Sequence, residues 1–139
     1  MANIYFYSEK TLFKLQNPKK TANWLIKVSQ KEQRPIESLI YVFCSDAQLS
    51  KMNEKYLHHS TLTDILSFDY SDSNAIQGEI YISIPRVRDN ARKFKQVFET
   101  ELRRVLVHGL LHFLGYKDKS PYQKAQMRIK EEACLSLWK

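Results

Sequence analysis

Apolar residues along the chain fall into two kinds of segment, and the kind of segment predicts its secondary structure. Short runs rich in β-branched and aromatic residues predict strands, whereas apolar residues three and four positions apart predict helices. The predicted strands are Asn3–Tyr7, Ser38–Cys44, Thr61–Phe68 and Glu79–Ile84, with Leu12–Leu15 continuing or pairing with the first. The last two strands flank a polar stretch, so we expect them to pair as a hairpin.

Capping residues mark where the predicted helices begin. A polar residue followed by proline, or Ser with Gln three positions later, is typical of a helix N-terminus. Helices are predicted from Asn17-Pro18 to Lys31, from Ser45 with Gln48 to about Tyr56, from Pro85 to Val97, after Thr100 as a cap, and from Ser120-Pro121 with Gln123. Early strands followed by a helical C-terminal half indicate an α+β or α/β domain around one modest sheet. We expect the α+β class, as a single domain over residues 1–139 with a small mixed sheet of about four strands packed against helices.

Composition is consistent with one folded domain. The chain has 139 residues, of which 43% are hydrophobic, with three Gly and four Pro, so there is enough apolar surface for a core. The longest apolar stretches, Leu39–Cys44 and Val105–Leu114, are shorter than the ~20 residues that span a bilayer. The first residues do not resemble a signal peptide, so we expect a cytoplasmic protein with no membrane partner. In that compartment Cys44 and Cys134 are expected to be free thiols.

The net charge favours an anionic partner. The chain carries 22 Lys+Arg against 15 Asp+Glu, which gives a formal net charge of +7. Nucleic acid, an acidic protein and an anionic membrane surface all fit this charge, and so does a surface that is merely solubilised by it. Charge alone does not choose among these.

The segment from Thr100 to Asp118 holds the most informative chemistry. It is apolar almost all round, which predicts a buried central helix, and its polar residues form one stripe that includes His108 and His112. Two imidazoles four residues apart can converge on one divalent ion. Gly115 is placed to end the helix in a left-handed conformation, so that Asp118 can turn back as a third ligand. The pattern H-x3-H-x5-D therefore predicts a metal site, although an isolated histidine pair is also common in ordinary packing.

The predicted ligands are typical of a catalytic site rather than a structural one. Two histidines and one carboxylate leave a coordination position open for water. The metalloprotease motif H-E-x-x-H has its general base directly after the first histidine, where this chain has Gly109. The glycine is also expected to leave room for a bulky substrate backbone beside the metal.

Several motifs together resemble the YbeY-type endoribonucleases, the ribosomal RNA maturation factors of bacteria. His108–Tyr116 is similar to that family's H-G-x-L-H-L-x-G motif, Thr63–Phe68 to its T-D-V-L-S-F strand, and Gly78–Ser83 to its G-D-I-x-I-S strand. Asn53–Tyr56 fits the preceding helix. The matches occur in the family's order from about residue 53 to residue 118.

The resemblance implies a metal-dependent endoribonuclease that cuts single-stranded RNA at the maturing 3′ end of small-subunit ribosomal RNA and acts in ribosome quality control. Single-stranded RNA, ribosomal RNA and the small ribosomal subunit are then the partners. The family binds one divalent ion, generally zinc, through three histidines, which fall on His108, His112 and, with a carboxylate instead, Asp118. Zinc is our expectation, although iron, manganese and nickel also suit such ligands.

Other positions also depart from the family pattern. Leu57 stands where the family usually has an arginine, and Ser60 where an acidic residue is common. If the missing arginine contacts RNA phosphate in the family, another cationic side chain would take that role here. The candidates are Arg104, Arg86, Arg88, Lys117 and Lys119. Each of them is also compatible with an ordinary solvated charge. The histidines of the loop, His58 and His59, are as compatible with a surface position as with the cleft.

No general acid or base is assigned, and other functions stay open. Asp64 and Glu79 lie on the matched strands, but each also suits a structural role. The main alternative is a non-enzymatic basic module that binds RNA or the ribosome and holds a structural metal. A zinc peptidase of another mechanism is a weaker alternative, and the oligomeric state is left open.

Overall fold

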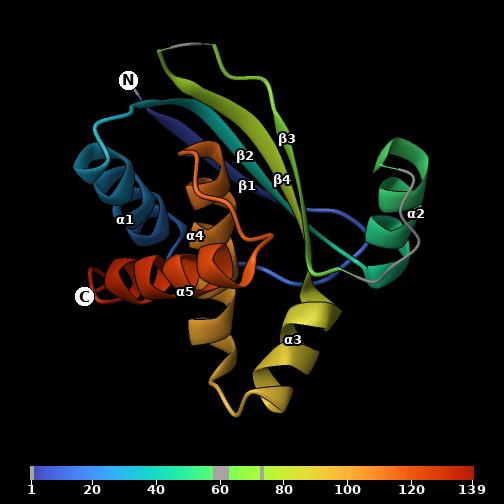
Figure 1. The fold of residues 1–139 in the computed structure, drawn as a ribbon. Coiled ribbons are helices and arrows are strands. Elements are labelled where there is room, and N and C mark those ends of the chain that lie inside the picture. The colour runs from blue at the N-terminus through green and yellow to red at the C-terminus, as the bar shows by residue number, and fades with distance from the viewer. Residues whose placement is uncertain (1, 58–62, 73) are drawn as a thin grey trace.

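The computed structural model describes residues 2–57, 63–72 and 74–139. Four strands and five helices follow one another along the chain (Figure 1). They are β1 (Asn3–Ser8), α1 (Pro18–Lys31), β2 (Ile36–Cys44), α2 (Asp46–Leu57), β3 (Ile65–Asp69), β4 (Ile76–Ser83), α3 (Ile84–Lys93), α4 (Phe98–Phe113) and α5 (Pro121–Leu135). The order of elements confirms the predicted α+β class.

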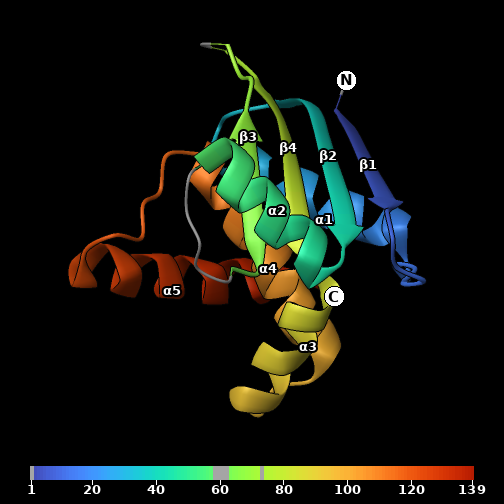
Figure 2. The same cartoon turned by 90° about the vertical axis from the view of Figure 1, so that its right-hand side faces the viewer.

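The strands form one mixed sheet in the order β1-β2-β4-β3. β2 pairs in parallel with both β1 and β4, while β3 runs antiparallel to β4 and confirms the predicted hairpin. The helices α1, α4 and α5 lie on one face of the sheet, and α2 lies on the other (Figures 1 and 2). β3 is an edge strand, and α4 contacts both β3 and β4, so α4 lies near this border of the sheet.

The buried central helix predicted from the sequence is α4. Its residues Leu106, Leu110 and Leu111 have no exposed surface, and they belong to the main core together with Ile80 of β4. The hydroxyl of Tyr41 on β2 is fully buried and donates a 2.7 Å hydrogen bond to the carbonyl oxygen of Leu106. This bond satisfies a phenol in the core and ties α4 to the middle of the sheet.

Three local predictions were wrong. Leu12–Leu15 is not a strand: the chain turns at Lys10 with a positive φ, and Phe13 and Leu15 pack against the core from a loop. α3 ends at Lys93 rather than Val97, because Lys95 adopts φ 55° and turns the chain. α4 then begins at Phe98 with Val97 as its N-cap, which leaves Thr100 inside the first turn.

The predicted caps were confirmed to different degrees. Ser120 and Gln123 form a complete capping box at the start of α5. Ser45 accepts a bond from the backbone of Gln48, whose side chain instead binds Glu9. Asn17 stands at the N-cap of α1 in a left-handed conformation without a capping bond from its side chain.

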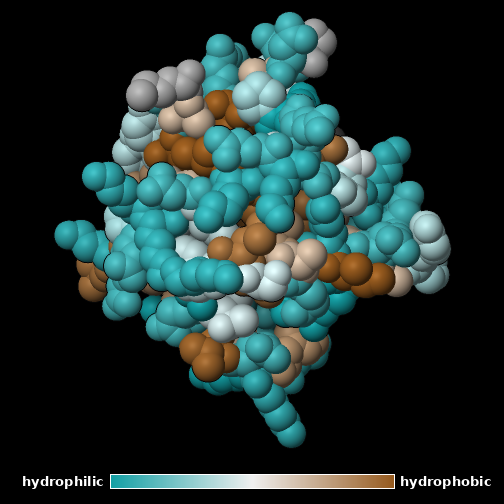
Figure 3. All heavy atoms as spheres, turned by 90° about the vertical axis from the view of Figure 1, so that its left-hand side faces the viewer, coloured by the Kyte–Doolittle hydropathy of each residue, from teal (hydrophilic) through white to brown (hydrophobic). Residues whose placement is uncertain are grey.

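The remaining expectations concern cysteines, membrane and surface. Cys44 and Cys134 are both buried and free. Among the described residues, no helix has the length and apolar character needed to cross a bilayer. The face around α1 and α5 is mostly hydrophilic, with hydrophobic side chains in small separate patches (Figure 3). The predicted strand residues Thr61 and Leu62 lie outside the described part of the chain.

Candidate metal centre

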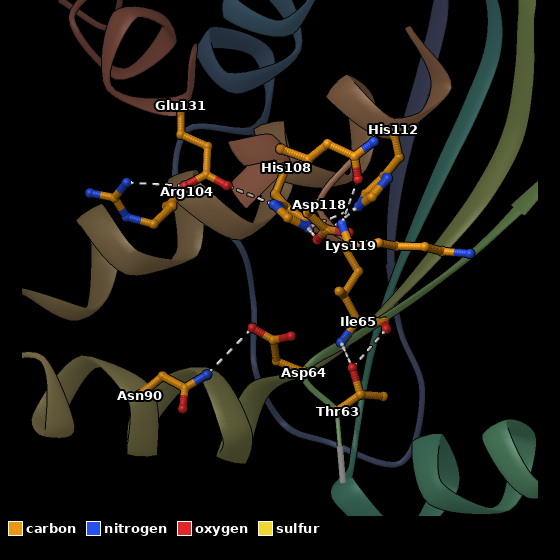
Figure 4. A network of polar contacts seen from close by, with 11 residues as sticks. Thr63, Asp64, Ile65, Asn90, Arg104, His108, His112, Asp118, Lys119 and Glu131 are labelled. Carbon is orange, nitrogen blue, oxygen red and sulfur yellow. Dashed lines mark hydrogen bonds and ion pairs between the residues drawn. The ribbon is translucent and has the colours of Figure 1, made fainter. Parts of the chain in front are cut away.

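The three predicted ligands meet at one point beside the C-terminal half of α4. The Nε2 atoms of His108 and His112 lie 3.0 Å apart. One carboxylate oxygen of Asp118 lies 3.1 Å from Nε2 of His108 and 3.3 Å from Nε2 of His112. The sequence predicts that these residues lie together, and in the structure their donor atoms form one triangle (Figure 4).

The triangle has the size of one face of a tetrahedral metal site. Zinc binds nitrogen and carboxylate oxygen at about 2.0–2.2 Å, so adjacent ligands of a tetrahedral ion lie about 3.3 Å apart. The separations of 3.0 to 3.3 Å are close to this value. The side chains of His108, His112 and Asp118 are 20%, 30% and 36% exposed, so a fourth position is accessible from solvent. The residues present therefore fit a divalent ion with an open position.

The backbone conformation on both sides of Asp118 keeps this residue close to the two histidines. Gly115 adopts φ +102°, which lets the chain reverse directly after α4. After Asp118, the side-chain oxygen of Gln123 accepts hydrogen bonds from the backbone amides of Lys119 and Ser120. The loop is thus fixed on both sides of Asp118 by a helix stop and a capping box.

A contact from the end of α1 supports the same loop. The hydroxyl of Tyr116 donates a 2.6 Å hydrogen bond to Glu32, which also forms a 2.7 Å ion pair with Lys130 of α5. Burial alone would raise the pKa of Glu32, but the bonds from Lys130 and Tyr116 outweigh it and lower the pKa. Glu32 is therefore an ionised anchor for the loop that carries Asp118.

Glu131 of α5 orients the first histidine. One of its carboxylate oxygens lies 2.6 Å from Nδ1 of His108, and the other accepts a 3.2 Å bond from Arg104 (Figure 4). With Nδ1 as the donor to Glu131, Nε2 of His108 has its lone pair free for a metal. Glu131 is only 6% exposed, so this carboxylate stays fixed between Arg104 and His108.

The pKa values of the two histidines are shifted in opposite directions. Burial lowers the pKa of His108, but the hydrogen bond and the charge of Glu131 outweigh burial and raise it. Burial and the neighbouring charge of His108 lower the pKa of His112, against a smaller opposing effect of Asp118. The neutral form of His112, which is the form that binds metal, is thereby favoured.

Two of the five predicted RNA-contacting cations lie at this centre. A pocket of about 350 Å³ opens beside His112 and Asp118, and its lining includes the exposed residues Lys117 and Lys119. The pocket is completed by Ser120 and Gln123 at the start of α5. The metal centre therefore faces a solvent-accessible hollow with two lysines at its border.

The three arginines have other surroundings. Arg104 is 7% exposed and its guanidinium bonds Glu131 and Glu132, which places it inside the protein rather than on an RNA-binding surface. Arg86 forms a 2.9 Å ion pair with Asp46. The guanidinium of Arg88 lies 5.3 Å from the ring centroid of Phe98.

A model of the family described as Endoribonuclease YbeY matches residues 3–139. The chain belongs to the endoribonuclease YbeY family. Endoribonuclease YbeY of Flavobacterium johnsoniae is 45% identical over 132 residues, 95% of each chain. Endoribonuclease YbeY of Amoebophilus asiaticus is 48% identical over 131 residues, 94% of this chain and 89% of that protein. The solution structure of TM1509 from Thermotoga maritima has a TM-score of 0.68 at 25% identity, covering 96% of this chain and 87% of that one.

Membership of the endoribonuclease YbeY family confirms the resemblance and supports an endoribonuclease role. At the position where the resemblance implies a third histidine, this chain has Asp118, whose donor atom is an oxygen. Leu57 ends α2. His58, His59 and Ser60 lie outside the described residues.

The structure separates the two carboxylates considered as acid or base in this endoribonuclease YbeY fold. Asp64 is partly buried on the α4 side near His108, and it accepts a 3.4 Å bond from Asn90. Burial raises the pKa of Asp64, with His108 opposing in part. Glu79 alternates with the core residue Ile80 on β4, so it points to the opposite face of the sheet from α4.

Gly109 has a different role from the one expected. It does not make room for substrate, because it faces the sheet: a Cβ there would lie 2.8 Å from Ile80 and 3.0 Å from Ile65. Gly109 therefore allows α4 to approach β3 and β4 closely.

Sequence reasoning missed Glu131 and Glu32. Glu131 did carry a signal, because Met127, Glu131 and Cys134 share one helical stripe and all three are buried. A carboxylate on an apolar stripe indicates a buried partner. No comparable signal marked Glu32, whose partners are 84 and 98 residues away.

Proposed function

We propose that this chain is a metal-dependent, single-strand-specific endoribonuclease. Its biological substrate is the 3′ end of small-subunit ribosomal RNA, and it acts in the cytoplasm with the small ribosomal subunit in maturation and quality control. The observation that carries the proposal is the triangle of His108, His112 and Asp118 beside a pocket bordered by lysines, in a chain of the endoribonuclease YbeY family. The whole of residues 1–139 acts as one domain in this proposal.

The protein's own residues divide the work. His108, His112 and Asp118 would hold a divalent ion, which would supply Lewis-acid polarisation of a phosphodiester and acidify water. Glu131 keeps the tautomer of His108 and the direction of its ring. Lys117 and Lys119, which line the pocket, would hold the anionic strand there. Arg86 and Arg88 remain candidates for contacts further along the strand, whereas Arg104 acts through Glu131.

Zinc is the proposed ion. Two imidazoles and one carboxylate are a donor set that zinc accepts, and the donor separations suit tetrahedral coordination. The same donor set also suits iron or manganese, for which six-coordinate sites are usual. Elemental analysis of the purified protein distinguishes these ions.

The decisive experiment combines metal content with RNA cleavage. His112→Ala is expected to lose both the bound ion and the cleavage of single-stranded RNA, since it removes one of three ligands. Glu132→Gln, on the exposed side of α5, is the matched control and should keep both. Unchanged cleavage by a metal-free preparation of His112→Ala would falsify the proposal.

RNA as the partner has its own test. Affinity for a single-stranded oligoribonucleotide should fall with salt, with a slope of about −0.7 per phosphate neutralised. Lys117→Gln and Lys119→Gln together remove two phosphate contacts and should make this slope shallower by about 1.4. A flat salt response contradicts an RNA substrate at this surface.

A purely structural metal is the second candidate. It is favoured by one observation: the ligands join α4 to the loop before α5, so an ion there would also brace the fold. In that case chelation lowers the melting temperature and leaves RNA affinity intact, with no cleavage by pure protein. An endoribonuclease loses cleavage on chelation and regains it when zinc is restored.

A further inference from the structure

A second pocket lies on the face of the sheet opposite the metal centre. It has a volume of about 240 Å³ and lies where α2 meets β3 and β4, on the face shown in Figure 2. Its lining consists of Met52 and Tyr56 of α2, Phe68 of β3, Tyr70 directly after β3, and Glu79 and Tyr81 of β4. Nothing in the proposed nuclease chemistry uses these side chains.

The aromatic rings of this pocket pack edge to face rather than in a flat stack. Phe68 lies at the centre, with its ring 6.0 Å from that of Tyr56 and 5.9 Å from that of Tyr81, at 86° in both cases. Tyr56 and Tyr70 are 55% and 60% exposed, a large apolar surface to leave in water. Edge-to-face packing turns the rings in different directions, and the exposed rings of Tyr56 and Tyr70 leave electron-rich surface that can attract a cation.

A carboxylate without a cationic partner completes this pocket. Glu79 accepts a 3.2 Å hydrogen bond from the hydroxyl of Tyr70, and among the described residues it has no ion pair. Desolvation and the charge of Glu79 raise the pKa values of Tyr70 and Tyr81. The pocket thus offers one carboxylate that no ion pair among the described residues neutralises, in a chain whose net charge is +7.

We propose that Tyr56, Phe68, Tyr70, Tyr81 and Glu79 form an aromatic cage that binds a lysine or arginine side chain from a basic segment of a partner protein. Charge complementarity carries the choice of occupant: the rings attract a cation through their faces, and Glu79 supplies the opposite charge. The Nζ atom of the chain's own Lys55 lies 5.2 Å from the centroid of the Tyr56 ring, so this ring already accepts a cation. An RNA strand fits less well, because its phosphates would approach the unpaired carboxylate.

Short peptides test the cage directly. The probes are flexible Gly/Ser peptides with one central Lys, Arg or Gln, titrated into the full chain while the ring signals of the four aromatic residues are followed by NMR. The Lys and Arg peptides should shift these signals with saturation, and the Gln peptide should not. Glu79→Gln and Tyr70→Leu should each weaken binding about 10-fold. Glu54→Gln removes an exposed carboxylate from the same helix as Tyr56 and should change nothing.

Three results would overturn the cage. They are equal binding of the Lys and Gln peptides, unchanged affinity in Glu79→Gln, and saturable ring shifts with a single-stranded oligoribonucleotide in place of the peptides, which would assign the pocket to RNA. RNA cleavage by Glu79→Gln should stay at the level of the unmodified chain, because Glu79 is on the other face of the sheet. Failure of the cage and failure of the nuclease are therefore separate outcomes.

Discussion

The carboxylate of Glu131 lies 2.6 Å from Nδ1 of His108, across the contact between α5 and α4. Arg104 holds the other oxygen of the same carboxylate, so an arginine, a glutamate and a histidine form one chain of bonds that ends at the metal centre. This arrangement orients His108 without contributing a donor atom to the triangle of His108, His112 and Asp118. Partners of this kind tune metal affinity because they fix both the tautomer and the ring direction.

Glu131→Gln should therefore lower metal affinity about 10- to 100-fold, while all three ligands remain. An amide does not stabilise the proton on Nδ1 as a carboxylate does, so the fixed tautomer of His108 is lost. The measurement is competition with a chelator of known affinity. Glu132→Gln is the matched control, because Glu132 also bonds Arg104 but is 58% exposed and does not contact His108. Equal loss in both variants would mean that Arg104, and not the bond to His108, controls the site.

Replacing Asp118, the third proposed ligand, should change which metal ion the site prefers. Asp118→His should keep a three-ligand site and favour zinc over manganese more strongly, because it replaces a hard oxygen by a nitrogen. Asp118→Ala should lose most of the affinity for either ion. Competitive titrations with zinc and manganese measure both effects. If Asp118→Ala binds zinc as tightly as the unmodified chain, then Asp118 is not a ligand.

Local signals explain why the sequence could predict that His108, His112 and Asp118 lie together. The spacing of His108 and His112, the positive φ of Gly115 and the capping box at Ser120 each act within a few residues. Gly115 reverses the chain before Asp118 and the capping box fixes the chain after it, so Asp118 lies close to the two histidines. The strands and most helices could be predicted for the same reason, because their patterns are local as well.

The features that escaped prediction depend on distant contacts. Leu12–Leu15 has a strand-like composition, but Phe13 meets the rings of Phe43 and Phe98 from a loop, so tertiary packing overrides local preference. Glu32 gains its role only when Tyr116 and Lys130 fold against it. Gly109 was interpreted as room for substrate because the sequence does not say which face of α4 meets the sheet.

Gly109→Val tests the close approach of α4 to the sheet. Two added methyl groups and a Cβ must fit where the side chains of Ile80 and Ile65 already lie within about 3 Å of the Cβ position. Such overpacking should lower the free energy of unfolding by about 1–3 kcal/mol. Urea denaturation measures the change. Ala125→Val on the exposed side of α5 controls for the helix propensity of valine, and an equal loss there would refute the packing explanation.

Glu32 predicts how stability depends on pH. Its pKa is lowered in the folded protein, below the value of about 4.3 for an unfolded glutamate. A lowered pKa contributes stability that is present above the unfolded pKa and is lost as the pH falls through the folded one. Glu32→Gln lacks this contribution, so its free energy of unfolding should be about 1–3 kcal/mol lower at pH 7. The difference from the unmodified chain should shrink as the pH falls below about 4.

Urea denaturation of both proteins at a series of pH values measures this convergence, and Glu37→Gln, an exposed carboxylate at the start of β2, is the control. Because Glu32 also holds Tyr116, Glu32→Gln should loosen the loop that carries Asp118 and weaken metal binding at pH 7. Glu37→Gln should do neither. A stability difference that stays constant from pH 7 to pH 3 would show that Glu32 acts through packing rather than through its charge, and the anchor would then not depend on its ionised form.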